Sequence, residues 1–383
     1  MKRTKLLVSC GISNTCHYCL KTWPSCQQVA RSPMSTLGKE TGGPASENKR
    51  GLKAIDLVQR ERESKGKPNS RKTPKLKETL SAVSPLQRRV TQLKQFTQQL
   101  QSVHPNVLAK VLHKSIVFQN QDVIVINKPY GVPVHDTTGA TTSIQSVLPV
   151  LAKMLHGMRT ETRLHICHSL DKDITGTLLL AQTEEAADHI HTLFKALQVE
   201  RKYWAVAVGV PVPSEGIVDI PVIEREVTGA QPHFKMGLSP LFQTSADGEG
   251  VTRVRANRHA HSAVTQYRVL DSTNSCSLVE LQPVTAVKHQ LRVHMAFAMG
   301  CVVLGDHKYA HWNKLAPQQL PEGVLRHLGL EQSKARHLPL HLHHHKLTIP
   351  GFKGHRDLTV SCRLPRFFTS SVQRLQLSLP EKP

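Results

Sequence analysis

Among the residues whose types and spacing could support chemistry, Asp171 is the clearest, and it lies in the segment His168-Ser169-Leu170-Asp171-Lys172-Asp173-Ile174-Thr175-Gly176. An aspartate between a strand and a Thr-Gly turn lies where a rigid sheet presents a side chain to a cleft. Its carboxylate can serve as a nucleophile or as an electrostatic stabiliser if it remains ionised. Because burial alone raises the pKa of a carboxyl group, such a site needs a permanent cation nearby, and arginine supplies one in a planar fork. The alternative is a solvated turn or capping aspartate, which is how we interpret Asp173.

Three other segments combine charged, aromatic or turn-forming residues with strand-like sequence. On its own, an aromatic pair such as Tyr203 and Trp204 fits a strand whose residues alternate between core and surface. The segments are Asn127–His135, in which a strand end runs into a turn with proline and glycine; Arg201–Gly209, which contains the aromatic pair; and His289–His294, followed after Gly300 by Leu304-Gly305-Asp306 and Tyr309.

Together with the Asp171 segment, these segments resemble the RluA-like family of RNA pseudouridine synthases, in the same order and with comparable spacing over about residues 115–350. The resemblance implies the pseudouridine synthase fold, an α+β structure whose mostly antiparallel mixed sheet is flanked by helices and has a central cleft. It also implies an isomerisation in which the glycosidic bond of a uridine in RNA breaks, the uracil turns, and carbon 5 rejoins the sugar. Because the reacting atom is hidden in a stacked base, the nucleotide must be flipped out.

The resemblance assigns roles to three residues. Asp171 matches the catalytic aspartate, Arg292 matches the arginine that pairs with it, and Tyr203 matches the tyrosine that stacks on the target base, so the last two are predicted to bind substrate. Without the resemblance, Arg292 could be a surface arginine on a helix. The sequence does not decide whether Asp171 adds to the base, adds to the sugar carbon or stabilises a glycal route.

The histidines of these segments, His168, His289 and His294, are interpreted as hydrogen-bonded structural residues rather than as direct catalysts. The isomerisation needs no redox equivalent, no metal and no high-energy donor. The chain contains neither a Gly-x-Gly-x-x-Gly motif nor a phosphate-binding loop. No cofactor is therefore expected.

Two departures from the family pattern concern how the substrate is handled. Ser169 stands where the family usually has an arginine, which fills the space left by the flipped base and touches phosphate. The family's Thr-Gly-Arg-Thr-His is replaced by Thr285-Ala286-Val287-Lys288-His289, so a flexible glycine and a cation are lost, and Lys288 is the candidate to replace the charge. Both departures put the efficiency of base flipping in question more than the chemistry.

Two clusters have the composition of metal sites, but neither is predicted to bind metal. Structural zinc needs four ligands fixed on a folded turn, and the first cluster lies in a leader-like segment. The second has no acidic or cysteine partner nearby, and alternation predicts a half-buried strand with Leu340 and Leu342 on one face and the histidines on a basic outer face. The clusters are Cys10, Cys16, Cys19 and Cys26 around His17, and His337, His341, His343, His344 and His345.

Hydrophobic periodicity predicts the elements that must position these residues. Apolar residues at three- and four-residue steps predict helices at about 85–100, 143–156 and 184–197, and a short helix capped by Asn106. Strands and helices mix without strict alternation, which indicates an α+β domain. Residues 210–262 and 310–336 are predicted to be loop-rich insertions. Strands are predicted at about 116–118, 123–126, 164–166, 177–181, 203–208, 264–270 and 277–282, followed by a helix over about 288–299.

Composition divides the chain into five predicted parts. Residues 1–40 are basic, rich in hydroxyl groups and almost free of acids, which is typical of a mitochondrial transit peptide; a disordered basic tail is the alternative. Residues 41–84 are poor in large apolar residues and are predicted to be a disordered basic linker. A helical lead-in at 85–114, a catalytic domain at 115–370 and a tail at 371–383 complete the prediction.

Charge and composition restrict the class of protein. The net charge of +22, half of it within residues 1–84, favours a partner with many phosphates. No apolar run is long enough to span a membrane, and eight cysteines are too few for a disulfide scaffold.

We therefore predict an RNA pseudouridine synthase of the mitochondrial matrix, with the nucleus and the cytoplasm as further locations. Its predicted substrates are specific uridines in mitochondrial ribosomal or transfer RNA, with messenger RNA as a further option. Ribosome-assembly and RNA-granule proteins are candidate partners. The alternative is a catalytically impaired RNA-binding factor in mitochondrial ribosome assembly, and the serine at position 169 is the residue that favours it.

Overall fold

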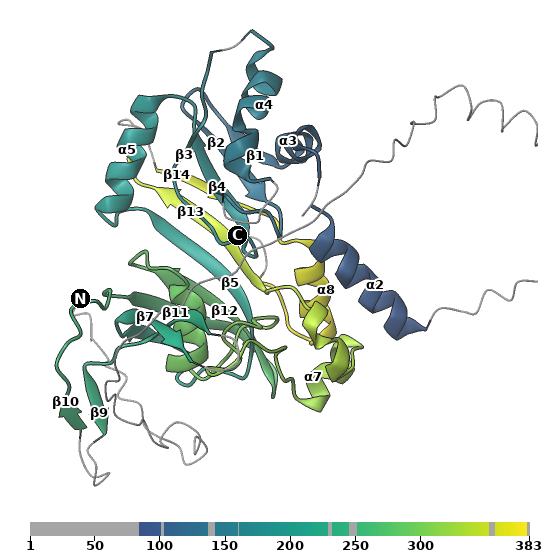
Figure 1. Cartoon of the computed structure of the whole chain (residues 1–383), viewed down its shortest axis with the longest axis vertical. Coiled ribbons are helices and arrows are strands. Elements are labelled where there is room, and N and C mark those ends of the chain that lie inside the picture. Colours follow the sequence, from purple (N-terminus) through teal and green to yellow (C-terminus); the bar gives the residue numbers. More distant parts are fainter. Residues whose placement is uncertain are drawn as a thin grey trace, which may run out of the picture. The chain divides into compact units, whose positions relative to one another are not determined.

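The computed structural model describes residues 84–100, 103–136, 142–159, 161–228, 232–244, 251–351 and 357–380. The strands of its main sheet are β1 (Ile116–Gln119), β2 (Val123–Lys128), β3 (His165–Ile166), β4 (Thr175–Ala181), β5 (Glu200–Val208), β6 (Glu215–Asp219), β11 (Val264–Ser272), β12 (Cys276–Pro283), β13 (Leu342–Ile349) and β14 (Leu358–Ser361). Their order is β1-β2-β4-β13-β5-β12-β11-β6, with β3 beside β4 and β14 beside β13 (Figure 1). All of these pairs are antiparallel except β4 with β13, which is parallel. The α+β class and the mostly antiparallel mixed sheet are confirmed.

The helices begin where the sequence supplies caps. Ser84 and Gln87 form a capping box at the start of α2 (Pro85–Gln98). The predicted Asn106 cap is wrong: Asn106 is inside α3 (Pro105–Lys114), and its backbone N–H donates to Nδ1 of the capping residue His104. The other helices are α4 (Ile144–His156), α5 (Glu184–Lys195), α6 (Gln290–Val293) with the π-helix η1 (His294–Ala298), α7 (Glu322–Leu328), the 3-10 helix η2 (Gln332–His337) and α8 (Arg366–Arg374).

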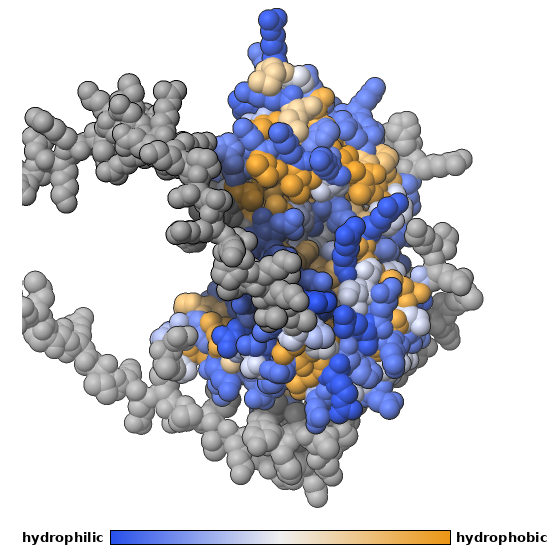
Figure 2. All heavy atoms as spheres, turned by 90° about the vertical axis from the view of Figure 1, so that its right-hand side faces the viewer, coloured by the Kyte–Doolittle hydropathy of each residue, from blue (hydrophilic) through white to orange (hydrophobic). Residues whose placement is uncertain are grey.

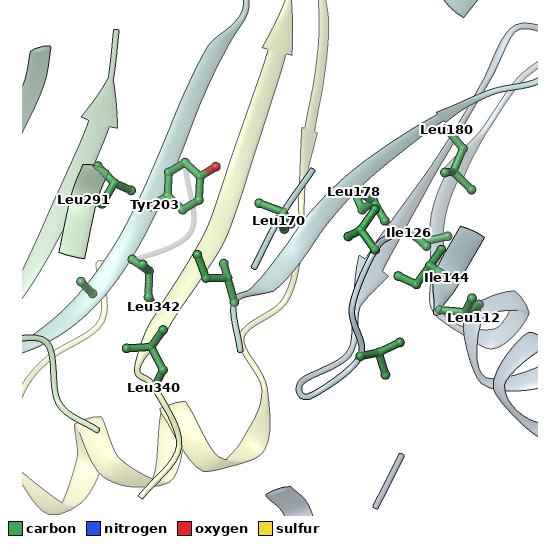
Figure 3. Packing of buried hydrophobic residues seen from close by; sticks show 14 of the residues in the cluster. Leu112, Ile126, Ile144, Leu170, Leu178, Leu180, Tyr203, Leu291, Leu340 and Leu342 are labelled. Carbon is green, nitrogen blue, oxygen red and sulfur yellow. The ribbon is translucent and has the colours of Figure 1, made fainter. Parts of the chain in front are cut away.

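The half of the sheet around β2 and β4 is buried on both faces. Val123 and Val125 lie in a cluster with residues of α5, whereas Ile124 and Ile126 lie in a cluster with residues of α3 and α4. The sequence of β2 is continuously apolar for this reason. In Figure 3 the second cluster extends from Leu112 and Ile144 through Ile126, Leu178 and Leu170 to Tyr203, Leu291 and Leu342.

The prediction that residues 210–262 and 310–336 are loop-rich insertions is wrong in large part. The first range contains β6, which pairs with β11 in the main sheet, and the hairpin of β7 (Val222–Val227) and β8 (His233–Leu238). It also contains the short pair β9 (Phe242–Thr244) and β10 (Val251–Arg253). These strands contain charged or polar residues and are apolar only over short stretches, so they lack the longer apolar runs on which the strand prediction relied. The second range contains α7 and most of η2.

The histidine-rich strand is also different from the prediction. β13 lies inside the sheet between β4 and β5, and His341, His343 and His344 are fully buried, so no basic outer face exists there. The imidazole of His341 contacts Ser371 and Phe367 of α8, and that of His343 contacts Thr175 of β4. Alternation fails as a guide because both faces of this central strand are covered.

Several predictions concern parts of the chain at the margins of the described residues. The leader-like segment 1–40, with its cysteine cluster, and the segment 41–83 lie outside them. Helix α8 runs across residue 370, where the tail was expected to begin, and Val372 is buried. Among the described residues, no helix is long and apolar enough to cross a membrane, and no group of three or more metal-binding side chains comes together. On the face to the right in Figure 1, where α2, α7 and α8 lie, hydrophilic residues predominate and apolar ones form separate groups (Figure 2).

Candidate active site

A cavity of about 440 Å³ lies between the loop before β4, strand β5 and the segment that leads into α6. Its volume falls within the range of small-molecule sites in proteins. Four regions far apart in the sequence supply its lining, and they include all three residues that the sequence analysis selected. The lining comprises Cys167, His168, Ser169, Leu170, Asp171, Ile174, Phe194, Arg201, Tyr203, Leu342 and residues 283 and 285–292.

Asp171 lies in the loop between β3 and β4, and a buried lysine holds this loop. Lys128, at the end of β2, is 1% exposed, and its Nζ donates to the carbonyl oxygens of Pro129, Lys172 and Ile174 at 3.1, 2.9 and 2.9 Å. Burial lowers the pKa of Lys128 to about 7, although nearby carboxylates raise it. Three carbonyl oxygens match the three N–H donors of an ammonium group, so one side chain fixes the backbone on both sides of the turn.

The parallel pairing of β4 with β13 brings the start of β4 very close to the neighbouring strand. Gly176 has φ +112°, and a Cβ atom at this position would lie 2.2 Å from the carbonyl oxygen of His344. Only glycine combines this backbone conformation with this approach. The glycine of the Thr-Gly turn is therefore required by the strand pairing that places Asp171.

Arg292 lies on α6 and contacts two carboxylates. Its Nε and Nη2 donate to Asp306 Oδ2 and Oδ1, both at 2.7 Å, while Nη1 is 3.4 Å from Asp171 Oδ2. Asp306 also accepts hydrogen bonds from the backbone N–H groups of Lys308 and Tyr309. Burial works against the charge of Arg292, but the two carboxylates outweigh it and raise the pKa of the guanidinium. Arg292 is thus a permanent cation clamped in a fixed orientation.

Asp306 is the partner that makes this clamp possible. Its side chain is 1% exposed. Burial raises the pKa of its carboxyl group, but Arg292 and the backbone donors lower it further, so Asp306 remains ionised. The preceding Gly305 has φ +82°, and a Cβ atom there would lie 2.0 Å from the carbonyl oxygen of Pro339.

His289 supplies a second contact to Asp171. Its Nε2 is 3.3 Å from Asp171 Oδ2, and its Nδ1 is 2.6 Å from the hydroxyl of the buried Tyr309. Burial lowers the pKa of His289 to about 4, despite the opposing effect of Asp171, and burial raises that of Tyr309. The phenol therefore donates to Nδ1, and the neutral imidazole donates from Nε2 to the carboxylate.

The carboxylate of Asp171 is left with one unoccupied oxygen. Both the Arg292 and the His289 contacts go to Oδ2, and the side chain is 30% exposed. Among the described residues, no hydrogen bond reaches Oδ1. An oriented carboxylate with a free oxygen facing a cavity has the geometry of a nucleophile or of an electrostatic stabiliser.

Tyr203 of β5 lines the same cavity as Arg292 and is 6% exposed. Its ring stacks on the imidazole of His344 with centroids 4.4 Å apart and an angle of 13° between the planes. Burial raises the pKa of Tyr203 to about 12, so its hydroxyl is protonated at neutral pH. Figure 3 shows the ring on β5 near Leu291 and Leu342.

The structure therefore brings Asp171, Arg292 and Tyr203 into one cavity, and Asp173 is not part of its lining. His168 and His294 are hydrogen-bonded: His168 Nε2 accepts from the backbone of Leu179, and His294 contacts Thr265 and the carbonyl of Ile220.

Two residues of the site were missed or misread from the sequence. His289 was interpreted as structural, yet it contacts Asp171 directly. Asp306 was noted only as part of a motif, and its position after a glycine was the available signal. At the departures from the family pattern, Ser169 is an exposed residue of the lining, and Lys288 is held 2.9 Å from Glu224 at the cavity rim.

Comparison with known proteins defines the class. The family model described as RNA pseudouridylate synthase matches residues 122–297, a range that contains Asp171, Tyr203 and Arg292. The chain belongs to this family, whose members are isomerases that convert uridine in RNA to pseudouridine.

The chain is similar throughout most of its length to particular members. It is 59% identical over 343 residues to "Pseudouridylate synthase RPUSD4, mitochondrial" of Danio rerio, covering 90% of this chain and 94% of that protein. The protein of the same name from Homo sapiens is 50% identical over 332 residues, with 86% of each chain covered. The solved structure "Human RNA Pseudouridylate Synthase Domain Containing 4" is 50% identical, covers 72% of this chain and 98% of its own, and superposes with a TM-score of 0.65.

Proposed function

We propose that this enzyme isomerises specific uridines in mitochondrial RNA and that Asp171 carries the chemistry. The observation that supports this most strongly is the carboxylate of Asp171, which lines the cavity and is oriented by Arg292 and His289 through Oδ2 alone. In the proposed reaction, the bond between N1 of the uracil and the sugar breaks, the uracil turns within the cavity, and carbon 5 bonds to the sugar. Carbon 5 then loses its proton and N1 gains one, so that the product is an isomer of the substrate. Asp171 adds to the base or the sugar, or stabilises a glycal.

Arg292 and Tyr203 are proposed to hold the substrate in place. Arg292 holds the Asp171 carboxylate in a fixed orientation, because its own position is fixed by Asp306. Tyr203 offers an aromatic face to a flipped pyrimidine, and stacking one base on an aromatic ring contributes roughly 1–3 kcal/mol. The other face of the ring is occupied by His344, which fixes the angle of the platform. Burial keeps its hydroxyl protonated at neutral pH, and we propose that this hydroxyl takes part in proton transfer at carbon 5.

The test is the substitution Asp171→Asn, which retains the volume of the side chain and removes its charge. We expect pseudouridine formation in a single-turnover assay to fall by several orders of magnitude, while RNA binding and thermal stability are retained. The matched control is Asp173→Asn, which removes the same charge two residues away and outside the cavity lining. Turnover of Asp171→Asn within threefold of the wild-type enzyme would place the chemistry on another residue.

We further propose the mitochondrial matrix as the location and ribosomal or transfer RNA as the substrate. The relatives with 50–59% identity carry the word mitochondrial in their names, and residues 1–40 have the composition of a transit peptide. Two experiments test this. A fusion of residues 1–40 to a reporter should enter mitochondria, and a cytosolic or nuclear reporter would contradict the location. Pseudouridine mapping across mitochondrial RNA, with and without the protein, should show which uridines lose their modification.

A further inference from the structure

A second cavity, of about 430 Å³, lies between β8 and the segment that follows Asp306. Its lining combines cations with apolar side chains and contains no acidic residue. Two large apolar side chains of this lining are exposed to solvent: Phe234 of β8 is 60% exposed and Leu315 is 51% exposed. Neighbouring exposed apolar side chains often mark a binding surface. Lys308 and Arg336 supply positive charge, and among the described residues neither forms an ion pair.

The walls of this cavity are held in place by buried polar groups. Lys235, next to Phe234 on β8, is fully buried, and its Nζ donates to the carbonyl oxygens of His311, Trp312 and Lys314 at 2.7, 3.0 and 3.0 Å. One cation therefore ties the strand that carries Phe234 to the loop that forms the opposite wall.

His307 fixes the rest of that wall. Its Nδ1 accepts from the backbone N–H of Gln318, and its Nε2 donates to the carbonyl oxygen of Leu338. The exposed aromatic ring is thus part of a preformed recess rather than the tip of a flexible loop.

The cavity is directly connected to the catalytic cluster through the chain. His307 and Lys308 follow Asp306, the residue that clamps Arg292. Nζ of Lys308 is 5.9 Å from the ring centre of Tyr309, whose hydroxyl contacts His289. Lys308 is therefore linked to Asp171 through Tyr309 and His289, which makes the second cavity a candidate contact for RNA bound at Asp171.

We propose that this second cavity binds a nucleotide that neighbours the target uridine in the same RNA strand. In this arrangement, the base of that nucleotide stacks on Phe234, and Lys308 and Arg336 contact the flanking phosphates. An aromatic face beside unpaired cations is the combination that recognises single-stranded nucleic acid. The inference rests on the proposed RNA substrate and adds a position at which a base outside the reaction is held.

The test is a cycle that changes the protein and the RNA together. RNAs that contain the target uridine, each with one abasic site at a position within three nucleotides on either side, are bound to wild type and to Phe234→Ala at constant salt. We expect Phe234→Ala to weaken binding of the unmodified RNA roughly 5- to 150-fold. At one abasic position, wild type and variant should bind equally, because the base that stacks on Phe234 is missing. Phe234→Trp should retain tight binding.

Two matched controls separate this site from general effects. Phe242→Ala removes another exposed ring, on β9, and should leave binding unchanged. Arg336→Gln should reduce the dependence of log K on log salt by about one, whereas Arg326→Gln, which removes the same charge from an exposed position on α7, should not.

Additive effects of Phe234→Ala and the abasic site at every position would overturn the proposal, as would an equal loss in Phe242→Ala. Wild-type turnover of the same RNA tests the proposed function separately. An active enzyme with an additive cycle would refute only the second cavity, and a chain that binds this RNA without converting it would refute only the proposed function.

Discussion

Two carboxylates contact the guanidinium of Arg292, and they do so very differently. Asp171 belongs to the loop before β4, here called the β4 wall, and Asp306 follows α6 and supports what is here called the α6 wall. On the α6 wall, Asp306 is 1% exposed and forms two hydrogen bonds of 2.7 Å with Arg292. On the β4 wall, Asp171 is 30% exposed and its contacts with Arg292 and His289 measure 3.4 and 3.3 Å. One carboxylate neutralises and fixes the cation, and the other is oriented by it but keeps a free oxygen. The difference shows how a single arginine can separate a structural acid from a reactive one.

The strongest way to break this comparison is Asp306→Asn. Removing one member of a buried charge pair leaves the other uncompensated and typically costs about 3–5 kcal/mol of stability. Because Arg292 then loses its fixed orientation, we expect activity to fall by about two orders of magnitude or more. Urea unfolding and single-turnover kinetics of the same preparation measure both effects.

The contrast with Asp171→Asn makes the result informative. Asp171→Asn should lose activity while keeping its unfolding free energy, and Asp306→Asn should lose both. If Asp306→Asn has the same unfolding free energy as the wild-type enzyme, the two carboxylates are equivalent partners of Arg292. The distinction between a structural and a reactive carboxylate would then be wrong.

A second substitution tests how the β4 wall is held. Lys128→Met keeps most of the apolar stem of Lys128 and leaves three carbonyl oxygens without their donor. We expect a loss of about 3 kcal/mol in unfolding free energy, since an unsatisfied buried polar group costs about 1–3 kcal/mol. A fall in turnover should accompany it, because the loop of Asp171 is no longer fixed. Lys172→Met, at an exposed position in the same loop, is the control and should change neither quantity appreciably.

Strand β13 lies between β4 and β5, and the buried histidines at its start, His341 and His343, predict a dependence of stability on pH. Burial lowers the pKa of His343 to about 3 and that of His341 to about 4, against an ordinary value near 6.5. The unfolded chain therefore binds protons before the folded chain does. Stability is fully present above about pH 6.5 and is lost as the pH falls toward the folded pKa values, by up to about 1.4 kcal/mol per pH unit for each histidine.

His343→Gln sharpens this prediction by removing one titrating group. Between pH 6 and pH 4.5, the slope of unfolding free energy against pH should decrease by about one proton relative to the wild-type enzyme. Any loss of hydrogen bonding shifts the whole curve and is measured at pH 8, where neither imidazole is charged. An unchanged slope would mean that His343 is protonated in the folded enzyme and that its buried imidazole is charged rather than neutral.

The smallest expected effect concerns Ser169, on the β4 wall. If an arginine here fills the space left by a flipped base, Ser169→Arg should speed the first turnover on a structured RNA severalfold. It should do far less for a loop uridine that is already unstacked, because the few kcal/mol of unstacking are then not needed. Single-turnover rates for both RNAs at two salt concentrations measure this. Equal acceleration of both would show that the residue tunes general affinity instead.

The sequence predicted the β4 wall better than the α6 wall, and the reason is physical. β2 and β4 are short apolar runs between turns, so periodicity alone located them. The helix expected over about 288–299 is instead a four-residue α-helix followed by a π-helix at His294–Ala298, which no apolar spacing indicates. Its bonds depend on distant partners, such as the contacts of His294 with Thr265 and Ile220.

The site was predicted only as far as local motifs extend. Asp171, Tyr203 and Arg292 were selected from their segments, and the structure places them together. The role of Asp306 depends on the bidentate contact with Arg292, fourteen residues away, which sequence spacing does not reveal. The buried histidines of β13 were misassigned to an outer face because nothing local indicates that α8 and both neighbouring strands cover them.

The one parallel pair of the sheet has a consequence for how the chain assembles. β4 meets β13 through residues 175–176 and 343–344, so the two strands can pair only after about nine-tenths of these 383 residues have left the ribosome or an import channel. Until then, β4 and β5 each lack a partner strand along the edge that β13 will occupy, and an unpaired edge is prone to aggregation. A nascent or partly translocated chain therefore carries an unfinished sheet and no catalytic cavity. Its protection during this interval depends on chaperones rather than on its own fold.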